Sequence, residues 1–194
     1  MLACPITRPA ACSPTQPPKT PAISVLVALG SDAMAISRLI DHSVRTGCAV
    51  DHRNDPELVN AWLRSTSPAR LLRLLDQGHV LARLALLQGR PVGFALAHVG
   101  GEILHCYVLS EFSRRGVGSA LMNDLEAHLL ERGCQTACLS SSLAGRGFYR
   151  HLGYREAGQP LRTGGLTLTP MEKSLMRPAM GDWIGRLTQR LSGG

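Results

Sequence analysis

Aromatic and charged side chains are scarce in this 194-residue chain, in which aromatics make up 4% and charged residues 18%. The low charge, combined with 44% hydrophobic residues, argues against a disordered chain and is enough for one folded core. The net charge of +7 does not form a basic stripe interleaved with aromatics, so we expect no nucleic acid partner. The apolar runs are too short for a membrane helix, so we expect no membrane partner.

Paired cysteines are also missing. The six cysteines form no Cys-x-x-Cys pair and no histidine spacing completes a zinc site, so we predict no metal centre. Free thiols are typical of a reducing compartment. Residues 1–22 are rich in proline and lack the apolar stretch of a signal peptide. We therefore interpret this segment as a flexible arm of a cytoplasmic protein.

The most specific feature is a strand, a basic glycine turn and an amphipathic helix between residues 107 and 131. The turn reads Ser-Arg-Arg-Gly-Val-Gly. Gly116 and Gly118 let successive backbone N–H groups converge, and the positive end of the following helix adds to them. Arg114 and Arg115 add charge at the rim. The pattern predicts a site for a phosphate or pyrophosphate.

Two nucleotide folds compete for such a loop, and spacing argues against both. A Walker loop needs Lys-Ser or Lys-Thr after its last glycine, whereas this chain has Ser119 and Ala120 there. A dinucleotide-binding turn needs three glycines and an acidic residue about 20 positions later, whereas this turn has two glycines. The loop instead resembles the acyl-coenzyme A loop of the GNAT acyltransferase superfamily, with Ser113 where that family prefers Gln or Arg.

A second stretch, Phe148-Tyr149-Arg150-His151-Leu152-Gly153-Tyr154, is similar to the C-terminal signature of the same superfamily. That signature is an aromatic pair, three variable residues, a glycine and an aromatic. Two ordered motifs about 30 residues apart are far more specific than one. Many members of the superfamily carry Asn where this chain has Ala144.

The resemblance covers residues 23–175, which we expect to form one GNAT N-acetyltransferase domain. Residues 176–194 follow as an amphipathic tail. Such a helix packs on its own domain or on a second copy more often than on a membrane, so a homodimer is an open alternative.

The resemblance implies an α/β fold, with a mixed, mostly antiparallel sheet flanked by helices and splayed at strands 4 and 5. It also implies acetyl-CoA as co-substrate, without a metal, and a backbone N–H group near residues 108–109 that polarises the thioester carbonyl. By this resemblance the residues that hold acetyl-CoA are Tyr107, Val108, Leu109, Arg114, Arg115, Gly116, Val117, Gly118, Ser119, Ala120 and Phe148.

Three side chains are candidates for catalysis. Tyr149 occupies the motif position that protonates the coenzyme A sulfur in many relatives, and a phenol pKa of about 10 suits that transfer; packing against the pantetheine arm is the alternative. Glu102 and His105 are candidates for the general base, with a solvated strand end and a structural histidine as the alternatives. Leu104 stands where several relatives have a carboxylate. Strict alternation places Glu102, Leu104 and Cys106 on one face of the strand.

The acceptor pocket is expected between the first strand and the third helix, together with the last hairpin. His42, His52, Asp55, Glu57 and Trp62 lie in that segment. We expect His52 or Asp55 to line the acceptor space and Trp62 to belong to the core.

The predicted function is N-acetyl transfer from acetyl-CoA to a primary amine of a small molecule, by direct attack in a ternary complex. Acetylation of protein or peptide N-termini, or of aminoacyl-tRNA, shares the same donor residues and is one alternative. A non-catalytic acyl-CoA sensor is another.

Hydrophobic periodicity and capping residues predict an alternating order of helices and strands. Ser31 is expected to cap the first helix, and a hairpin around Thr163-Gly164-Gly165 is expected to end the domain. The expected strands span 23–28, 79–87, 92–98, 102–109, 136–140, 155–162 and 166–171. The expected helices span 31–45, 67–78, 116–132 and 143–152, and a further helix opens at residues 55–57.

Overall fold

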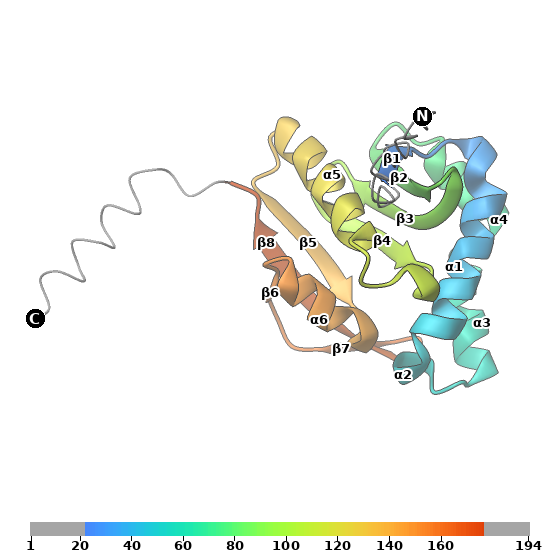
Figure 1. Cartoon of the computed structure of the whole chain (residues 1–194). Coiled ribbons are helices and arrows are strands. Elements are labelled where there is room, and N and C mark those ends of the chain that lie inside the picture. Colours follow the sequence, from blue (N-terminus) through green and yellow to red (C-terminus); the bar gives the residue numbers. More distant parts are fainter. Residues whose placement is uncertain (1–21, 177–194) are drawn as a thin grey trace, which may run out of the picture.

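A computed structural model describes residues 22–176 and shows an eight-stranded sheet with helices on both faces (Figure 1). Seven strands are ordered β1-β2-β3-β4-β5-β8-β6, and β7 pairs with β8. All neighbours are antiparallel except β4 and β5, which are parallel. The strands are β1 (Ile23–Val27), β2 (Val80–Leu87), β3 (Arg90–His98), β4 (Glu102–Val108), β5 (Thr136–Ser141), β6 (Arg155–Glu156), β7 (Leu161–Thr163) and β8 (Leu166–Ser174).

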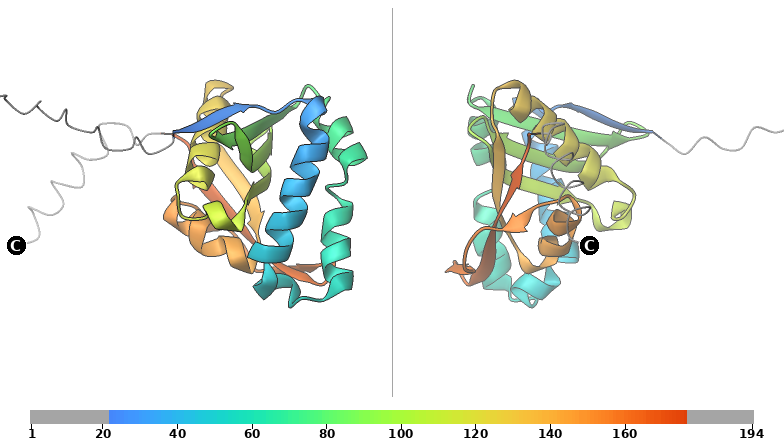
Figure 2. Two further views of the ribbon diagram at one scale, coloured as in Figure 1. Left: turned by 45° about the vertical axis from the view of Figure 1, so that its right-hand side comes forward. Right: turned by 90° about the vertical axis from the view of Figure 1, so that its left-hand side faces the viewer.

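Two hydrophobic cores lie on opposite faces of this sheet. One face is covered by α5 and α6, and the other by α1, α3 and α4; Figure 2 shows α1 and α4 side by side. The apolar residues of α1 and α5 recur at helical spacing, which gives each helix one face to bury. The helices are α1 (Ala33–Gly47), α2 (Ala49–His52), α3 (Pro56–Arg64), α4 (Pro68–Leu75), α5 (Val117–Glu131) and α6 (Leu143–His151), with short 3₁₀ turns η1 (Gly30–Asp32) and η2 (Ser110–Phe112).

The sheet opens between β4 and β5. These strands pair only where β4 begins, at Glu102 with Cys138 and at Ile103 with Leu139. Gly101, just before β4, has φ of 103°, and a Cβ there would lie 2.5 Å from the Thr136 carbonyl oxygen. Glycine therefore permits the close approach that starts the pairing. Beyond Ile103 the two strands diverge, which confirms the predicted splay.

A β-bulge in β4 changes which side chains share a face. Leu96 pairs with His105 but Ala97 pairs with Ile103, so Leu104 is an extra residue without a partner across the pair. As a result Ile103 and Cys106 both pack in the core under α5. The predicted alternation, in which Leu104 shares a face with Cys106, is wrong because one extra residue reverses the pattern.

The elements differ most from prediction in three places. Helix α2 was not predicted, because four residues are too short for a periodic pattern. Ser31 does not cap the first helix: it lies within η1, and Asp32 is the N-cap residue of α1. The last hairpin joins β7 to β8 around Gly164 and Gly165, and β6 is a separate two-residue strand.

Most of the predicted N-terminal arm and C-terminal tail lies outside the described residues. No helix within residues 22–176 is long and apolar enough to cross a membrane.

Candidate active site

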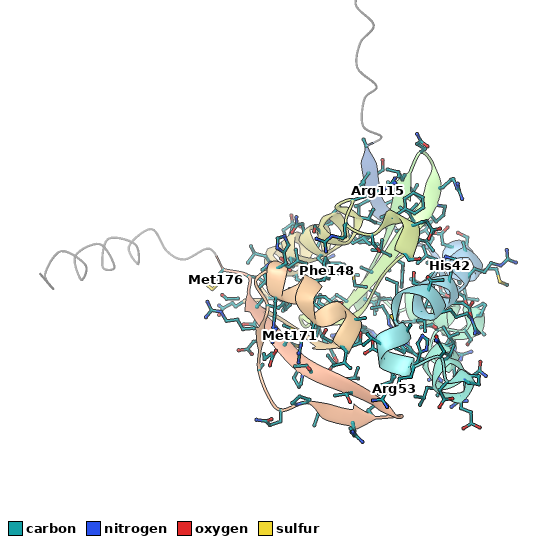
Figure 3. All side chains as sticks on the ribbon, turned by 60° about the horizontal axis from the view of Figure 1, so that its bottom comes forward. His42, Arg53, Arg115, Phe148, Met171 and Met176 are labelled. Carbon is teal, nitrogen blue, oxygen red and sulfur yellow. The ribbon has the colours of Figure 1, made fainter. Side chains whose placement is uncertain are left out.

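A cleft of about 1250 Å³ lies where β4 and β5 separate. Its walls come from the C-terminal half of α1, from α3, from β4, from the loop before α5, from α6 and from the β7–β8 hairpin. In Figure 3, His42 marks α1 and Phe148 marks α6. The hairpin also reaches α3, because a Cβ on Gly165 would lie 2.3 Å from the Leu58 side chain.

The glycine turn before α5 presents backbone donors to the cleft. Arg114 and Gly116 have positive φ, of 60° and 83°, and Gly116 is the N-cap residue of α5. No side chain within the described part of the chain caps this helix end, and the first helical bond runs from the Ala120 N–H to the Gly116 carbonyl. The N–H groups of residues 117–119 precede that bond and have no helical partner, so they can bind a phosphate. The Ala120 N–H is already used within the helix, and a contact between Ala120 and acetyl-CoA stays a prediction.

The side chains around this turn have different roles. Arg114 lines the cleft, whereas the Arg115 guanidinium stacks over Phe112 with 5.6 Å to the ring centroid. The Val117 side chain is buried in the core, 1% exposed, so only its backbone can serve the site. Gly118 lies against the Phe148 ring, 2.9 Å from where a Cβ would stand. Phe148 therefore packs directly on the start of α5.

The Val108 N–H at the end of β4 is free to polarise a carbonyl group. The Leu109 N–H donates to the Val92 carbonyl of β3 at 3.0 Å. Alternate N–H groups of an antiparallel strand point to the same neighbour. The Val108 N–H therefore points away from β3, to the side where β5 has diverged. This limits the expected polarising group to Val108, because the Leu109 N–H is already bonded.

Tyr149 lies on α6 and lines the same cleft. Its ring packs beside Phe148 and edge-on against Tyr154, with ring centroids 5.1 and 5.7 Å apart. Its hydroxyl lies near the Cys106 thiol. Burial, with a further contribution from Cys106 and Tyr107, raises the pKa of Tyr149 well above its ordinary value. The phenol therefore keeps its proton at neutral pH and is available as an acid.

The two candidate bases differ in their surroundings. His105 lines the cleft, and burial lowers its pKa to about 4, so the ring is neutral at pH 7. Its ring lies 5.8 Å from that of Tyr107, whose hydroxyl accepts a hydrogen bond from the Trp62 indole N–H at 2.9 Å. Glu102 is exposed at the start of β4, six residues before Val108. At about 3.3 Å per residue this separation is roughly 20 Å, too far for direct contact with an amine beside Val108.

A comparison of the chain with known protein families agrees with this site. A family model described as acetyltransferase (GNAT) domain matches residues 50–175, well over half of the chain. The chain belongs to the GNAT acetyltransferase family. It is therefore an acyltransferase with the predicted GNAT fold. No curated protein sequence matches it.

Solved GNAT structures resemble most of the chain. A GCN5-related N-acetyltransferase from Rhodopseudomonas palustris is 28% identical, with a TM-score of 0.69 over 80% of this chain and 96% of that one. The PaiA N-acetyltransferase from Thermoplasma acidophilum, solved with coenzyme A, is 18% identical, with a TM-score of 0.67 over 79% and 99%. The ribosomal-protein-S18-alanine N-acetyltransferase from Escherichia coli is 19% identical, with a TM-score of 0.55 over 82% and 97%.

The predicted acceptor residues of this GNAT domain do not reach the cleft. The His52 side chain is 1% exposed, and both ring nitrogens are bonded, to the Val44 carbonyl and to the Asn54 N–H, each at 3.0 Å. Asp55 caps α3 by accepting from the Glu57 N–H at 2.8 Å. Both predictions are corrected, because these side chains are used by the local backbone.

Trp62 packs against the hydrophobic core, as the sequence predicted, and it also lines the GNAT cleft. Sequence reasoning missed Asp51, which is 8% exposed and accepts from the Leu143 and Ala144 N–H groups at 2.6 and 3.1 Å. No local pattern identifies Asp51, because its partners are 92 and 93 residues away in the chain. Residues 22–176 contain no group of His, Cys, Asp and Glu suited to a metal ion.

Proposed function

We propose that this GNAT enzyme transfers the acetyl group of acetyl-CoA to a primary amine of a small molecule, by direct attack in a ternary complex. One observation carries the proposal. A single continuous cleft is lined by the glycine turn, by Val108 and Tyr149, and by a separate wall from α1, α3 and the β7–β8 hairpin. Donor and acceptor can therefore be bound together, with the thioester beside Val108 and Tyr149.

The donor half offers a separate contact for each part of acetyl-CoA. The pyrophosphate would accept hydrogen bonds from the N–H groups of residues 117–119, with Arg114 nearby. Phe148 would pack against the pantetheine arm. These residues fit the coenzyme because the start of α5 carries uncapped donors and faces the cleft.

The reaction needs two protein groups at the thioester. The amine nitrogen attacks the thioester carbon while the Val108 N–H donates to the carbonyl oxygen and stabilises its developing negative charge. A C–N bond forms, the C–S bond breaks, and Tyr149 gives its proton to the departing thiolate. The proton lost by the amine leaves through water and restores the Tyr149 hydroxyl. Water accepts the proton of the amine because His105, with its lowered pKa, is a weak base and Glu102 is too far from the amine.

The acceptor wall is mostly apolar or hydroxylic. It includes Trp62 of α3, Ser65 just after α3, Cys48 after α1, and Leu166 and Leu168 of β8. These side chains suit an apolar molecular body better than a highly polar one.

The few charged side chains in the cleft also favour an apolar acceptor. Among the described residues that line the cleft, one carboxylate, Glu102, and one guanidinium, Arg114, are present. A charged group that is removed from water without a partner costs several kcal/mol. A polyamine or aminoglycoside carries several ammonium groups, so this cleft favours an acceptor with one amine on an apolar body.

The first test is calorimetric titration with acetyl-CoA, followed by a thiol-release assay on a panel of amines. The panel contains aromatic and apolar monoamines, amino acid amides, peptides with free N-termini, polyamines and aminoglycosides. We expect acetyl-CoA binding, and release of free thiol with an apolar monoamine. Release only with peptides would favour the N-terminal alternative, and binding without release on any acceptor would favour an acyl-CoA sensor.

A variant separates the donor site from the acceptor question. Gly118→Trp places a large ring where a Cβ already meets Phe148 at 2.9 Å. We expect it to lose acetyl-CoA binding while the far-ultraviolet circular dichroism spectrum is retained. Tight binding by a folded Gly118→Trp protein would contradict the assignment of the glycine turn.

A further inference from the structure

We propose that Asp51 is a positioning residue that holds α6, and with it Tyr149, in register with the acceptor wall. The proposal rests on the proposed function for its kinetic consequence. Its structural part, the attachment of α6 to α2 by one carboxylate, can be tested without any acceptor.

The attachment uses both oxygens of a buried carboxylate. Asp51 Oδ1 accepts from the Leu143 N–H at 2.6 Å, and Oδ2 accepts from the Ala144 N–H at 3.1 Å. The side chain is 8% exposed, so water competes little with these bonds. They are charge-assisted and lie at the positive end of α6, which strengthens them. The Ser142 hydroxyl oxygen adds a weaker contact by accepting from the Gly145 N–H at 3.4 Å.

His52, the residue after Asp51, attaches α2 to α1. His52 Nδ1 accepts from the Asn54 N–H, so its proton is on Nε2, which donates to the Val44 carbonyl of α1 at 3.0 Å. Two consecutive residues of α2 therefore join α1 to α6. Figures 1 and 3 show α2 beside the beginning of α6.

This connection spans the place where the sheet is open. Donor-side α6 carries Phe148 and Tyr149, whereas α1 contributes to the acceptor wall, and β4 and β5 do not pair beyond Ile103. Strand pairing therefore does not set the distance between the two sides at the depth of Tyr149. Asp51 supplies a direct bond between the two sides at the start of α6, the helix that carries Tyr149. Small misplacements of a reacting group can cost up to about 100-fold in rate.

The test is Asp51→Asn, which removes the charge and leaves one carbonyl acceptor in a side chain of the same shape. We expect kcat to fall about tenfold to 100-fold, with KM for acetyl-CoA within about twofold, because the glycine turn is untouched. We also expect faster amide hydrogen exchange over residues 143–151. Where no acceptor turns over, thiol release from acetyl-CoA by water replaces kcat as the rate measured.

A double-mutant cycle distinguishes positioning from general destabilisation. If Asp51 acts through Tyr149, the Asp51→Asn effect on kcat should nearly disappear in the Tyr149→Phe background. An equal loss of rate in both backgrounds would overturn the proposal. Unchanged hydrogen exchange over 143–151 would also overturn it, whether or not the proposed reaction is correct.

Asp55→Asn is the matched control. Asp55 also caps a helix through backbone N–H groups, those of Glu57 and Leu58, but that helix is α3, which does not carry Tyr149. We expect this variant to lower thermal stability while kcat stays within twofold of wild type. A similar loss of kcat in both variants would reduce Asp51 to a helix cap without a positioning role.

Discussion

At the scale of single residues, Tyr149 lines the cleft and keeps its proton at neutral pH, and the pKa raised by burial makes it a weaker acid than a free phenol. Its hydroxyl lines the same cleft as Val108 and is our candidate donor to the thiolate that leaves the thioester. We predict that Tyr149→Phe lowers kcat by about 10²–10⁴-fold, the usual contribution of a general acid, with KM for acetyl-CoA nearly unchanged. Steady-state thiol release measures both quantities.

The neighbouring Tyr154 provides the control for that experiment. It loses the same hydroxyl in Tyr154→Phe, but it is 2% exposed and donates to Glu126 at 2.9 Å, outside the cleft. We expect Tyr154→Phe to lower stability and to leave kcat within a few-fold. If Tyr149→Phe retains wild-type kcat, the acid role is wrong.

The lowered pKa of His105 predicts how the free energy of unfolding depends on pH. Its pKa is lowered by burial to about 4 in the folded protein, from an ordinary value of 6.5. A lowered pKa means that the unfolded chain binds the proton more strongly. The stabilising effect of neutral His105 is therefore complete above about pH 6.5 and is lost progressively as the pH falls from 6.5 to 4. The loss can reach about 2–3 kcal/mol.

Urea unfolding at several pH values measures this dependence. In His105→Gln the decline between pH 6.5 and 4 should be smaller by about the same amount, because no proton is taken up at this position. An unchanged slope in the variant would show that His105 is not buried as a neutral ring.

At the scale of elements, the junction of β4 and β5 depends on one glycine. A Cβ on Gly101 would stand 2.5 Å from the Thr136 carbonyl oxygen, and φ is 103°. We predict that Gly101→Ala lowers the free energy of unfolding by at least about 1–3 kcal/mol, because both strain and a backbone clash result. The matched control is Gly78→Ala, since a Cβ there meets nothing within 4 Å. Equal stability of the two variants would contradict this account of the junction.

The bulge in β4 changes the face on which side chains lie, and the sequence of the strand does not predict it. The strand itself was predicted from residues 102–109 and is present at Glu102–Val108. Its facing was predicted incorrectly, because Leu104 is an extra residue opposite Leu96 and Ala97. A bulge depends on the partner strand, so no pattern within β4 alone predicts it.

At the scale of the whole molecule, acetyl-CoA binding should stabilise the fold, because the proposed donor site exists only when the start of α5, β4 and α6 are assembled. At a ligand concentration 100 times Kd the gain is about 2.7 kcal/mol. For a domain of this size we predict a rise in Tm of about 5–10 °C. Differential scanning calorimetry with and without acetyl-CoA measures it, and Gly118→Trp should show no rise. A wild-type Tm that does not respond to acetyl-CoA would contradict the donor site.

The sequence by itself determined the family, the order of most elements and the glycine turn, because these depend on neighbouring residues. Positive φ at Gly116, an apolar stripe on α5 and an aromatic pair in α6 can each be recognised locally. Only the tertiary structure decided which groups remain free. The N–H of Val108 rather than that of Leu109 faces the cleft, and the His52 ring is hydrogen-bonded to the backbone.

The tertiary structure also decided the hydrogen bonds between Asp51 and α6. The partners of Asp51 are 92 and 93 residues away and meet it only after the sheet has formed. Hydrogen-bond partners across such distances follow from packing and not from local propensity. That is why the donor loop could be read from the chain, whereas the acceptor wall and the support of Tyr149 required the folded molecule.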